Sequence, residues 1–183
     1  MNKKVLLLFA TMSLLACNFL FTQKPTATPE IINVLPTEAV SQADQSETTS
    51  LTGFTIIRLQ PKDGDLQIML AKEAQKAITL GQMPIVEFDA TWCPPCQAID
   101  AAIKSKNKLM RNAYNGTYII KLDVDEWDWN NGKVQDFHFD AIPVYFKLDS
   151  DGHQTGDFID GGAWGEDIPE NIAPVMDKFF HSK

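Results

Sequence analysis

The feature that most constrains the fold is a short apolar run, residues 84–88, which is followed within a few positions by Cys93 and Cys96. The run shows little polar alternation, as is typical of a strand in the middle of a sheet that is covered on both faces. Cysteines separated by two residues lie one helical turn apart, and such a pair can close into a disulfide and reopen. The sequence therefore predicts a central strand that leads into a redox-capable thiol pair.

The pattern from residue 51 onward alternates between strands and helices. We predict strands at residues 54–59, 85–88, 117–124, 144–148 and 157–159, and helices at residues 65–80, 94–110, 133–138 and 167–180. Residues 149–152 carry a hairpin signal between the last two strands. The order βαβα followed by βαββα predicts one α/β domain over residues 51–183.

Composition narrows the classes of partner and cofactor. The chain of 183 residues has a formal net charge of −8 and no basic stripe, which excludes nucleic acid because phosphate binding needs clustered Lys and Arg. Three cysteines are too few for a disulfide scaffold. A zinc site needs four ligands, but there is no second cysteine pair and the three histidines are scattered. We therefore expect no metal and no organic cofactor.

The first residues carry an export signal. Lys3 and Lys4 precede an apolar core, residues 5–16, of the kind that a secretion apparatus recognises. Residues 14–17 resemble the lipobox of bacterial lipoproteins, in which cleavage before the cysteine is coupled to its acylation. We therefore predict a signal peptide over residues 1–16 and a lipid on Cys17. An uncleaved anchor over residues 5–21, or ordinary secretion, is the alternative.

Residues 17–50 are predicted to be a lipidated start and a disordered tether. They are rich in Thr, Ser, Gln, Glu and Pro and show no sustained helical or strand period. A small apolar group at residues 31–35 is the exception and could dock on the domain. The tether would let the domain work on the outer side of a bacterial membrane, in the periplasm or at the cell surface.

Three separated signals resemble the thioredoxin superfamily over residues 53–180. They are Trp92-Cys93-Pro94-Pro95-Cys96 after the buried strand, Ile142-Pro143 at the start of the next-to-last strand, and Gly161-Gly162 after the last one. The resemblance implies a thioredoxin fold, a mixed central β-sheet flanked by helices on both faces. It also implies a monomeric enzyme that exchanges thiols and disulfides with other proteins.

The two cysteines have different expected roles. Cys93 precedes a helix, so its sulfur takes the place of an N-cap oxygen and faces the positive end of the helix dipole. This favours the thiolate and makes Cys93 the attacking sulfur. Cys96 lies one turn into the helix, is expected to be more buried, and resolves the mixed disulfide. Trp92 is expected to cover one side of the site.

The resemblance assigns further site residues. Glu87 falls where the family often places a buried carboxylate that exchanges protons with the resolving cysteine, and Lys121 matches the lysine that accompanies it. Pro143 corresponds to the family's cis-proline, and the backbone of Ile142 before it pairs with an extended substrate. Gly162 completes the expected substrate groove.

The residues between the cysteines bear on the direction of electron flow. Pro94 and Pro95 each remove a backbone donor that could stabilise the Cys93 thiolate, and neither is a histidine or a basic residue. A less stabilised thiolate means a lower reduction potential, so we favour a reductant served by an electron-donor protein. A disulfide oxidase or isomerase, or a binding or chaperone module without turnover, is the alternative.

Two features depart from the thioredoxin pattern. Asp89 stands where cytoplasmic thioredoxins commonly carry a tryptophan, and we expect it to disfavour the Cys93 thiolate and repel acidic partners. Trp127 and Trp129 lie in a long loop after the third strand. They either form a partner-binding surface or pack onto the domain.

Overall fold

Strand β2 (Met83–Asp89) is the centre of the sheet in the computed structural model, which describes residues 53–129, 134 and 136–182. The strand order is β1-β3-β2-β4-β5. Strands β1 (Thr55–Arg58) and β3 (Thr117–Asp123) run parallel to β2, whereas β4 (Val144–Leu148) and β5 (Gln154–Asp160) complete the sheet in antiparallel pairs. The predicted mixed sheet is therefore confirmed.

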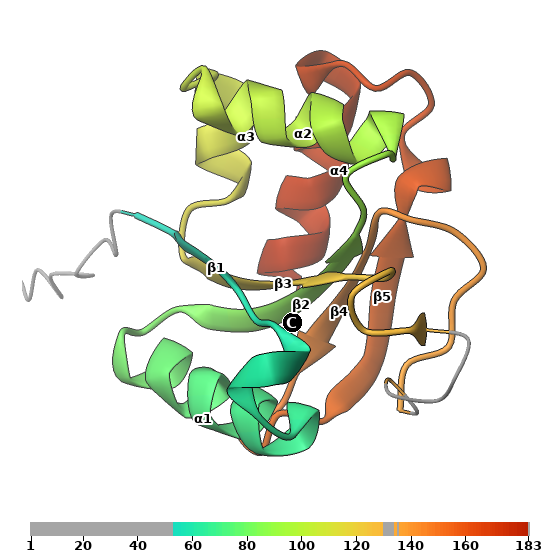
Figure 1. Cartoon of the computed structure of the whole chain (residues 1–183). Coiled ribbons are helices and arrows are strands. Elements are labelled where there is room, and N and C mark those ends of the chain that lie inside the picture. The colour runs from blue at the N-terminus through green and yellow to red at the C-terminus, as the bar shows by residue number, and fades with distance from the viewer. Residues whose placement is uncertain (1–52, 130–133, 135, 183) are drawn as a thin grey trace, which may run out of the picture. The chain divides into compact units, whose positions relative to one another are not determined.

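Helices cover both faces of this sheet (Figure 1). Helix α1 (Leu66–Thr79) packs on one face, while α2 (Pro94–Lys104), α3 (Lys108–Ala113) and α4 (Pro169–His181) pack on the other. Short 3₁₀ helices, η1 (Pro61–Asp63) and η3 (Gly161–Ala163), join strands to helices. Each face has its own apolar core, which explains why β2 reads as an apolar run.

The period of two along the strands sorts their side chains between the cores. On β2, Val86 and Phe88 belong to the core under α1, whereas Ile85 belongs to the core under α2, α3 and α4. Glu87 and Asp89 alternate with Val86 and Phe88, so they fall on the same face as Ile85. Two carboxylates are thereby placed inside the protein, beneath α2.

Two predicted helices differ from those observed. The helix predicted over residues 94–110 is two helices, because Lys106 takes a φ of 62° and the side chain of Asn107 accepts from the backbone of Leu109 and Met110 to start α3. The described residues 134 and 136–138 form turns and irregular structure rather than the helix predicted over 133–138. The last strand, β5, is longer than the predicted 157–159.

Among the described residues, no helix is both long and apolar enough to cross a membrane. The predicted signal peptide, the lipid on Cys17 and the tether over residues 17–50 all lie outside the described residues.

Candidate active site

Cys93 and Cys96 form a disulfide at the start of α2. Cys93 is the N-cap of that helix, and its Sγ accepts a hydrogen bond from the backbone N–H of Cys96 at 3.3 Å. Pro94 and Pro95 fill the first two helical positions and have no N–H to donate. The predicted cap geometry is therefore present, with a single backbone donor on the sulfur.

The sulfurs lie at the edge of the protein without being open to solvent. Both cysteines are only 2% exposed in this disulfide form. Our expectation that Cys96 is more buried than Cys93 is therefore wrong for the oxidised protein. Sγ of Cys93 lies 3.7 Å from the carbonyl oxygen of Ile142, and the Ile142–Pro143 peptide bond is cis. The thiol pair thus faces the backbone that is predicted to pair with a substrate.

A glycine packs directly against Pro143, but it is not the predicted one. The N–H of Gly161 donates to the carbonyl oxygen of Pro143 at 2.9 Å, and a Cβ at Gly161 would lie 3.2 Å from the Pro143 ring. Gly162 instead donates to the carboxylate of Asp160. Gly161 is therefore the residue whose lack of a side chain lets the backbone approach the cis-proline closely. The substrate-binding role of Gly162 stays a prediction.

Trp92 flanks the disulfide as an open, oriented side chain. It is 60% exposed, and its indole N–H donates to Asp125 Oδ2 at 2.7 Å. The two tryptophans of the following loop have different environments. Trp127 is 3% exposed and donates to the carbonyl oxygen of Leu59, so it packs into the domain, whereas Trp129 is only partly buried.

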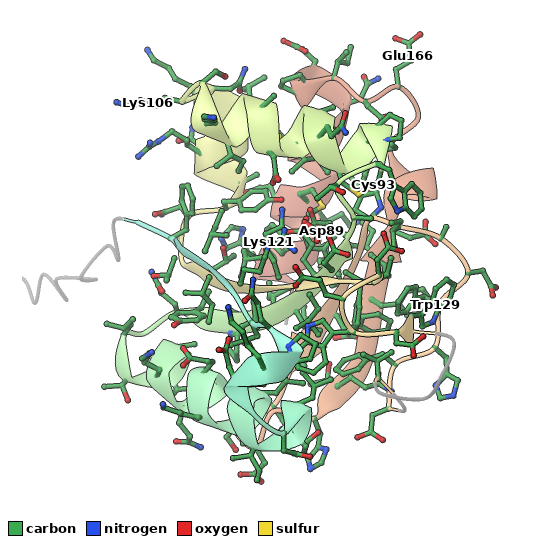
Figure 2. All side chains as sticks on the ribbon, in the orientation of Figure 1. Asp89, Cys93, Lys106, Lys121, Trp129 and Glu166 are labelled. Carbon is green, nitrogen blue, oxygen red and sulfur yellow. A yellow bond between two sulfur atoms is a disulfide. The ribbon has the colours of Figure 1, made fainter. Side chains whose placement is uncertain are left out.

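A cluster of charged side chains lies beneath α2 (Figure 2). Strands β2 and β3 are in a register that pairs Glu87 with Lys121, and both side chains are buried. The Lys121 ammonium nitrogen lies 3.2 Å from Glu87, 2.9 Å from Asp89 and 2.6 Å from Asp100. One buried cation therefore contacts three carboxylates.

Arg58 adds a second cation to this cluster. Its guanidinium donates two hydrogen bonds to the two oxygens of Asp89, at 2.8 and 2.6 Å. Asp89 is buried, and its negative charge is neutralised by both Arg58 and Lys121. Our expectation that Asp89 repels acidic partners is wrong, because its carboxylate does not reach the surface.

Burial favours a proton on Glu87. The surrounding charges are mixed: Arg58 and Lys121 face the carboxyl groups of Glu87, Asp89 and Asp100, and the buried Asp123 also acts on Arg58. Burial raises the pKa of Glu87 to about 7, although the attraction of Lys121 opposes this. Burial lowers the pKa of Lys121, but Glu87 and Asp89 outweigh that effect and keep it raised. Glu87 can therefore take up and release a proton near neutral pH.

Asp100 connects the buried carboxyl to solvent. Its side chain is 55% exposed, yet it accepts a hydrogen bond from Lys121, which also contacts Glu87. Our sequence reasoning missed this residue, although it lies four positions after Cys96 and hence on the same face of α2. It also missed Arg58, which occupies the register position beside Lys121 on β1.

Among the described residues, no group of three or more His, Cys, Asp or Glu side chains could hold a metal ion. In the acidic loop after β3, the carboxylate of Asp123 hydrogen-bonds to the backbone of the loop. Asp123 Oδ1 accepts hydrogen bonds from the N–H groups of Asp125 and Glu126.

Comparison with known proteins identifies the family. A family model described as Thioredoxin matches residues 66–173, which is more than half of the chain. The chain belongs to the thioredoxin family. Thioredoxins exchange thiols and disulfides, so the Cys93–Cys96 disulfide is the redox pair of a thiol:disulfide oxidoreductase.

Individual relatives are distant. Thioredoxin H4 of Arabidopsis thaliana is 28% identical over 109 residues, which cover 58% of this chain and 77% of that protein. The chloroplastic thioredoxin-like protein HCF164 of Oryza sativa subsp. japonica is 25% identical over 85 residues, which cover 46% of this chain but only 31% of that protein. A solved Schistosoma mansoni thioredoxin pre-protein matches 70% of this chain and 99% of its own, with 20% identity and a TM-score of 0.40.

Replacing Glu87 by glutamine should change how the stability of this thioredoxin depends on pH. The carboxyl loses its proton near pH 4.5 when unfolded and near pH 7 when folded, so its contribution is fully present below pH 4.5 and is lost as the pH rises through 7. The Glu87→Gln variant lacks this loss. Its free energy of unfolding relative to wild type should therefore rise, by up to about 3 kcal/mol, between about pH 5 and pH 8. Urea unfolding of the two oxidised proteins measures the difference.

Glu126→Gln is the matched control, because it removes an exposed carboxylate from the same half of the protein. It should leave the pH dependence of wild type unchanged. If Glu87→Gln also follows the wild-type pH dependence, the pKa of Glu87 is not raised and the proton-exchange role is wrong.

Proposed function

We propose that this protein is a membrane-attached, extracytoplasmic thioredoxin that reduces disulfides in other proteins through Cys93 and Cys96. The observation that supports electron flow from this protein to its targets is the hydrogen bonding of Cys93 at the start of α2. Its sulfur accepts one backbone hydrogen bond, from Cys96, because Pro94 and Pro95 occupy the two positions before it in the helix. The reduced form consequently gains little stabilisation, as suits a reductant.

The exchange proceeds in two balanced steps. The Cys93 thiolate attacks one sulfur of the target disulfide, which forms a mixed disulfide and releases the other target sulfur as a thiolate. Cys96 then gives its proton to the Glu87 carboxylate and attacks Cys93, which releases the second target sulfur. The target gains two electrons and leaves as two thiolates, which take up protons from solvent, while the Cys96 proton remains on Glu87. The protein ends with the Cys93–Cys96 disulfide seen in the structure.

Glu87 is suited to the proton step because of its position. Asp100 lies one helical turn after Cys96 and contacts the same Lys121 ammonium as Glu87, so the charge cluster lies under the first turns of α2. Lys121 keeps its own proton, because its neighbours raise its pKa, and its charge stabilises the Glu87 carboxylate once the proton has left for solvent. The oxidised protein then needs a separate electron-donor protein to return it to the dithiol.

The location rests on the N-terminal sequence. The export signal over residues 1–16 and the lipobox-like residues 14–17 support a lipid on Cys17, and residues 18–50 support a tether. Outside the cytoplasm a dithiol is surrounded by oxidants, so it requires a dedicated donor if it is to reduce others. The lipobox-like residues 14–17 support a bacterial origin.

Pro95→Ala should make the protein less reducing. The substitution restores a backbone N–H at the second helical position, from which N-cap side chains accept hydrogen bonds. A second hydrogen bond to the charged sulfur should lower the Cys93 pKa by about one unit and raise the reduction potential by about 30 mV. Thiolate absorbance and equilibration with glutathione measure the two quantities on the full chain.

Pro94→Ala is the control, because the N–H of the first helical position is not one that an N-cap side chain accepts. It should shift the pKa and the potential less than Pro95→Ala does. For the wild-type chain we expect a potential nearer to about −270 mV than to about −120 mV, the value of a strong disulfide-forming oxidant. A reduction potential near about −120 mV would contradict the proposal that the protein is a reductant. If the reduced protein does not reduce insulin disulfides, the proposal that it is an enzyme fails.

Cys17→Ser should release the protein from the membrane. In a bacterial host, we expect the wild-type chain to incorporate a fatty-acid label and to sediment with membranes, and the Cys17→Ser variant to do neither. Cys93→Ser is the matched cysteine control and should keep both the label and the membrane attachment. A Cys17→Ser chain that stays in the membrane without label indicates an uncleaved anchor and contradicts the lipoprotein.

A further inference from the structure

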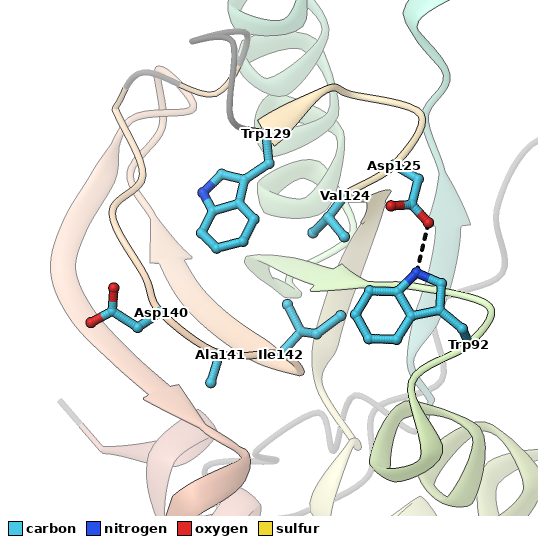
Figure 3. Close-up of a pocket in the computed structure, with 7 residues that line it drawn as sticks. All are labelled: Trp92, Val124, Asp125, Trp129, Asp140, Ala141 and Ile142. Carbon is cyan, nitrogen blue, oxygen red and sulfur yellow. Dashed lines mark hydrogen bonds between the residues drawn. The ribbon is translucent and has the colours of Figure 1, made fainter.

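A pocket of about 380 Å³ lies beside Trp92, the residue before Cys93 (Figure 3). Its lining comes from the loop after β3 and from the segment before the cis-proline, and includes Val124, Ala141 and Ile142. The carbonyl oxygen of Ile142 is also the group that lies 3.7 Å from Cys93 Sγ. The pocket therefore begins at the residue that a bound target chain is expected to meet.

Two tryptophans contribute aromatic walls to the pocket. Trp92 projects from the turn before Cys93, and its indole N–H is held by Asp125. Trp129 is stacked on Phe139, with ring centroids 4.7 Å apart and ring planes inclined by 8°. Because Phe139 covers one face of Trp129, the pocket meets the remaining face or the ring edge. Both rings are fixed in place before any ligand arrives.

The charged groups that line the pocket are all negative among the residues that the structure describes. Asp125 and Asp140 lie on opposite sides of it, and none of its described lining residues is Lys, Arg or His. Asp125 uses one oxygen for the Trp92 N–H. Asp140 is exposed, and no other residue in the described part of the chain hydrogen-bonds or ion-pairs with its carboxylate. Two carboxylates thus lie at the rim of a small space with apolar and aromatic walls.

We propose that this pocket binds a basic side chain of the target protein, arginine above lysine, located within a few residues of the target's disulfide. The inference rests on the proposed reduction of protein disulfides and names the class of target. A long basic side chain has an apolar stem suited to Val124, Ala141 and Ile142 and a cationic head suited to the carboxylates. Arginine has the further advantage that its planar guanidinium stacks on tryptophan and pairs with carboxylates through two hydrogen bonds.

The position of the pocket explains why the basic residue must be near the disulfide. A target that pairs in extended form with Ile142 places its cysteine at Cys93, and an extended chain advances about 3.3 Å per residue. Only side chains close to that cysteine can reach between Trp92 and Trp129. The pocket consequently selects among disulfides rather than among whole proteins by net charge.

Synthetic disulfide peptides test this proposal. The peptides are identical except that arginine, leucine or glutamate is placed in turn at each of the three positions on either side of the cysteine. The reduced full chain should reduce the arginine peptide about five-fold faster than the leucine peptide at the best position, and the glutamate peptide more slowly than both. Added salt should narrow these ratios, since exposed charges are screened.

Variants separate the pocket from the overall negative charge. Asp140→Asn should reduce the arginine preference, and Asp140→Lys should reverse the order of the arginine and glutamate peptides. Asp151→Asn is the matched control, because it removes one exposed carboxylate in the β4–β5 turn, at the end of the sheet away from the cysteines. It should leave the preference unchanged.

The outcomes distinguish this inference from the proposed function. Equal rates for all three peptides at every position overturn the inference but leave the reductase activity intact. A loss of preference in Asp151→Asn as large as that in Asp140→Asn also overturns it, because bulk charge then explains the result. If no peptide is reduced at all, the proposed function fails, and the inference fails with it.

Discussion

The rest of the site depends on one buried ammonium group, that of Lys121. It lies on β3, beside the central strand, and contacts carboxyl groups from β2 and from α2. Without this cation, Arg58 alone would compensate two neighbouring buried carboxyl groups, Glu87 and Asp89, and burying a carboxylate without a partner is costly. Lys121 thereby allows two carboxyl groups to be placed beneath the helix that begins at the redox cysteines.

The N-terminus of α2 and the charge cluster beneath that helix have different roles in the exchange reaction. At the sulfur end, the helix N-terminus and a single N–H favour the Cys93 thiolate without strongly stabilising it. Beneath the helix, burial, helped by the nearby carboxylates of Asp89 and Asp100, raises the pKa of Glu87 to about 7, so that Glu87 holds a proton near neutrality. Asp89 belongs to this second system because Arg58 and Lys121 neutralise it.

Local patterns predicted much of the fold and part of the site. The apolar run before Cys93 predicted β2, and the family resemblance predicted the placement of Glu87, Lys121 and the cis bond at Pro143. The break between α2 and α3 was missed because it depends on a positive φ at Lys106, a conformation that lysine does not signal.

Other features require the three-dimensional arrangement. Arg58 on β1 reaches Asp89 on β2 across β3, so their pairing follows from a strand order that the sequence does not state. The pocket beside Trp92 likewise combines Trp129 with Asp140, which belong to separate segments of the chain. Asp100 is different, since its spacing of four from Cys96 is a helical signal that was available in the sequence.

The most direct test of the account is a carbon-13 NMR titration of the Glu87 side-chain carboxyl in the folded full chain. We predict a midpoint near pH 7, because burial outweighs the attraction of Lys121. Glu126, which is exposed, serves as the internal reference in the same spectra. A Glu87 midpoint at or below 4.5, its ordinary value, would mean that the ion pair outweighs burial, and it would contradict the role of Glu87 in proton exchange.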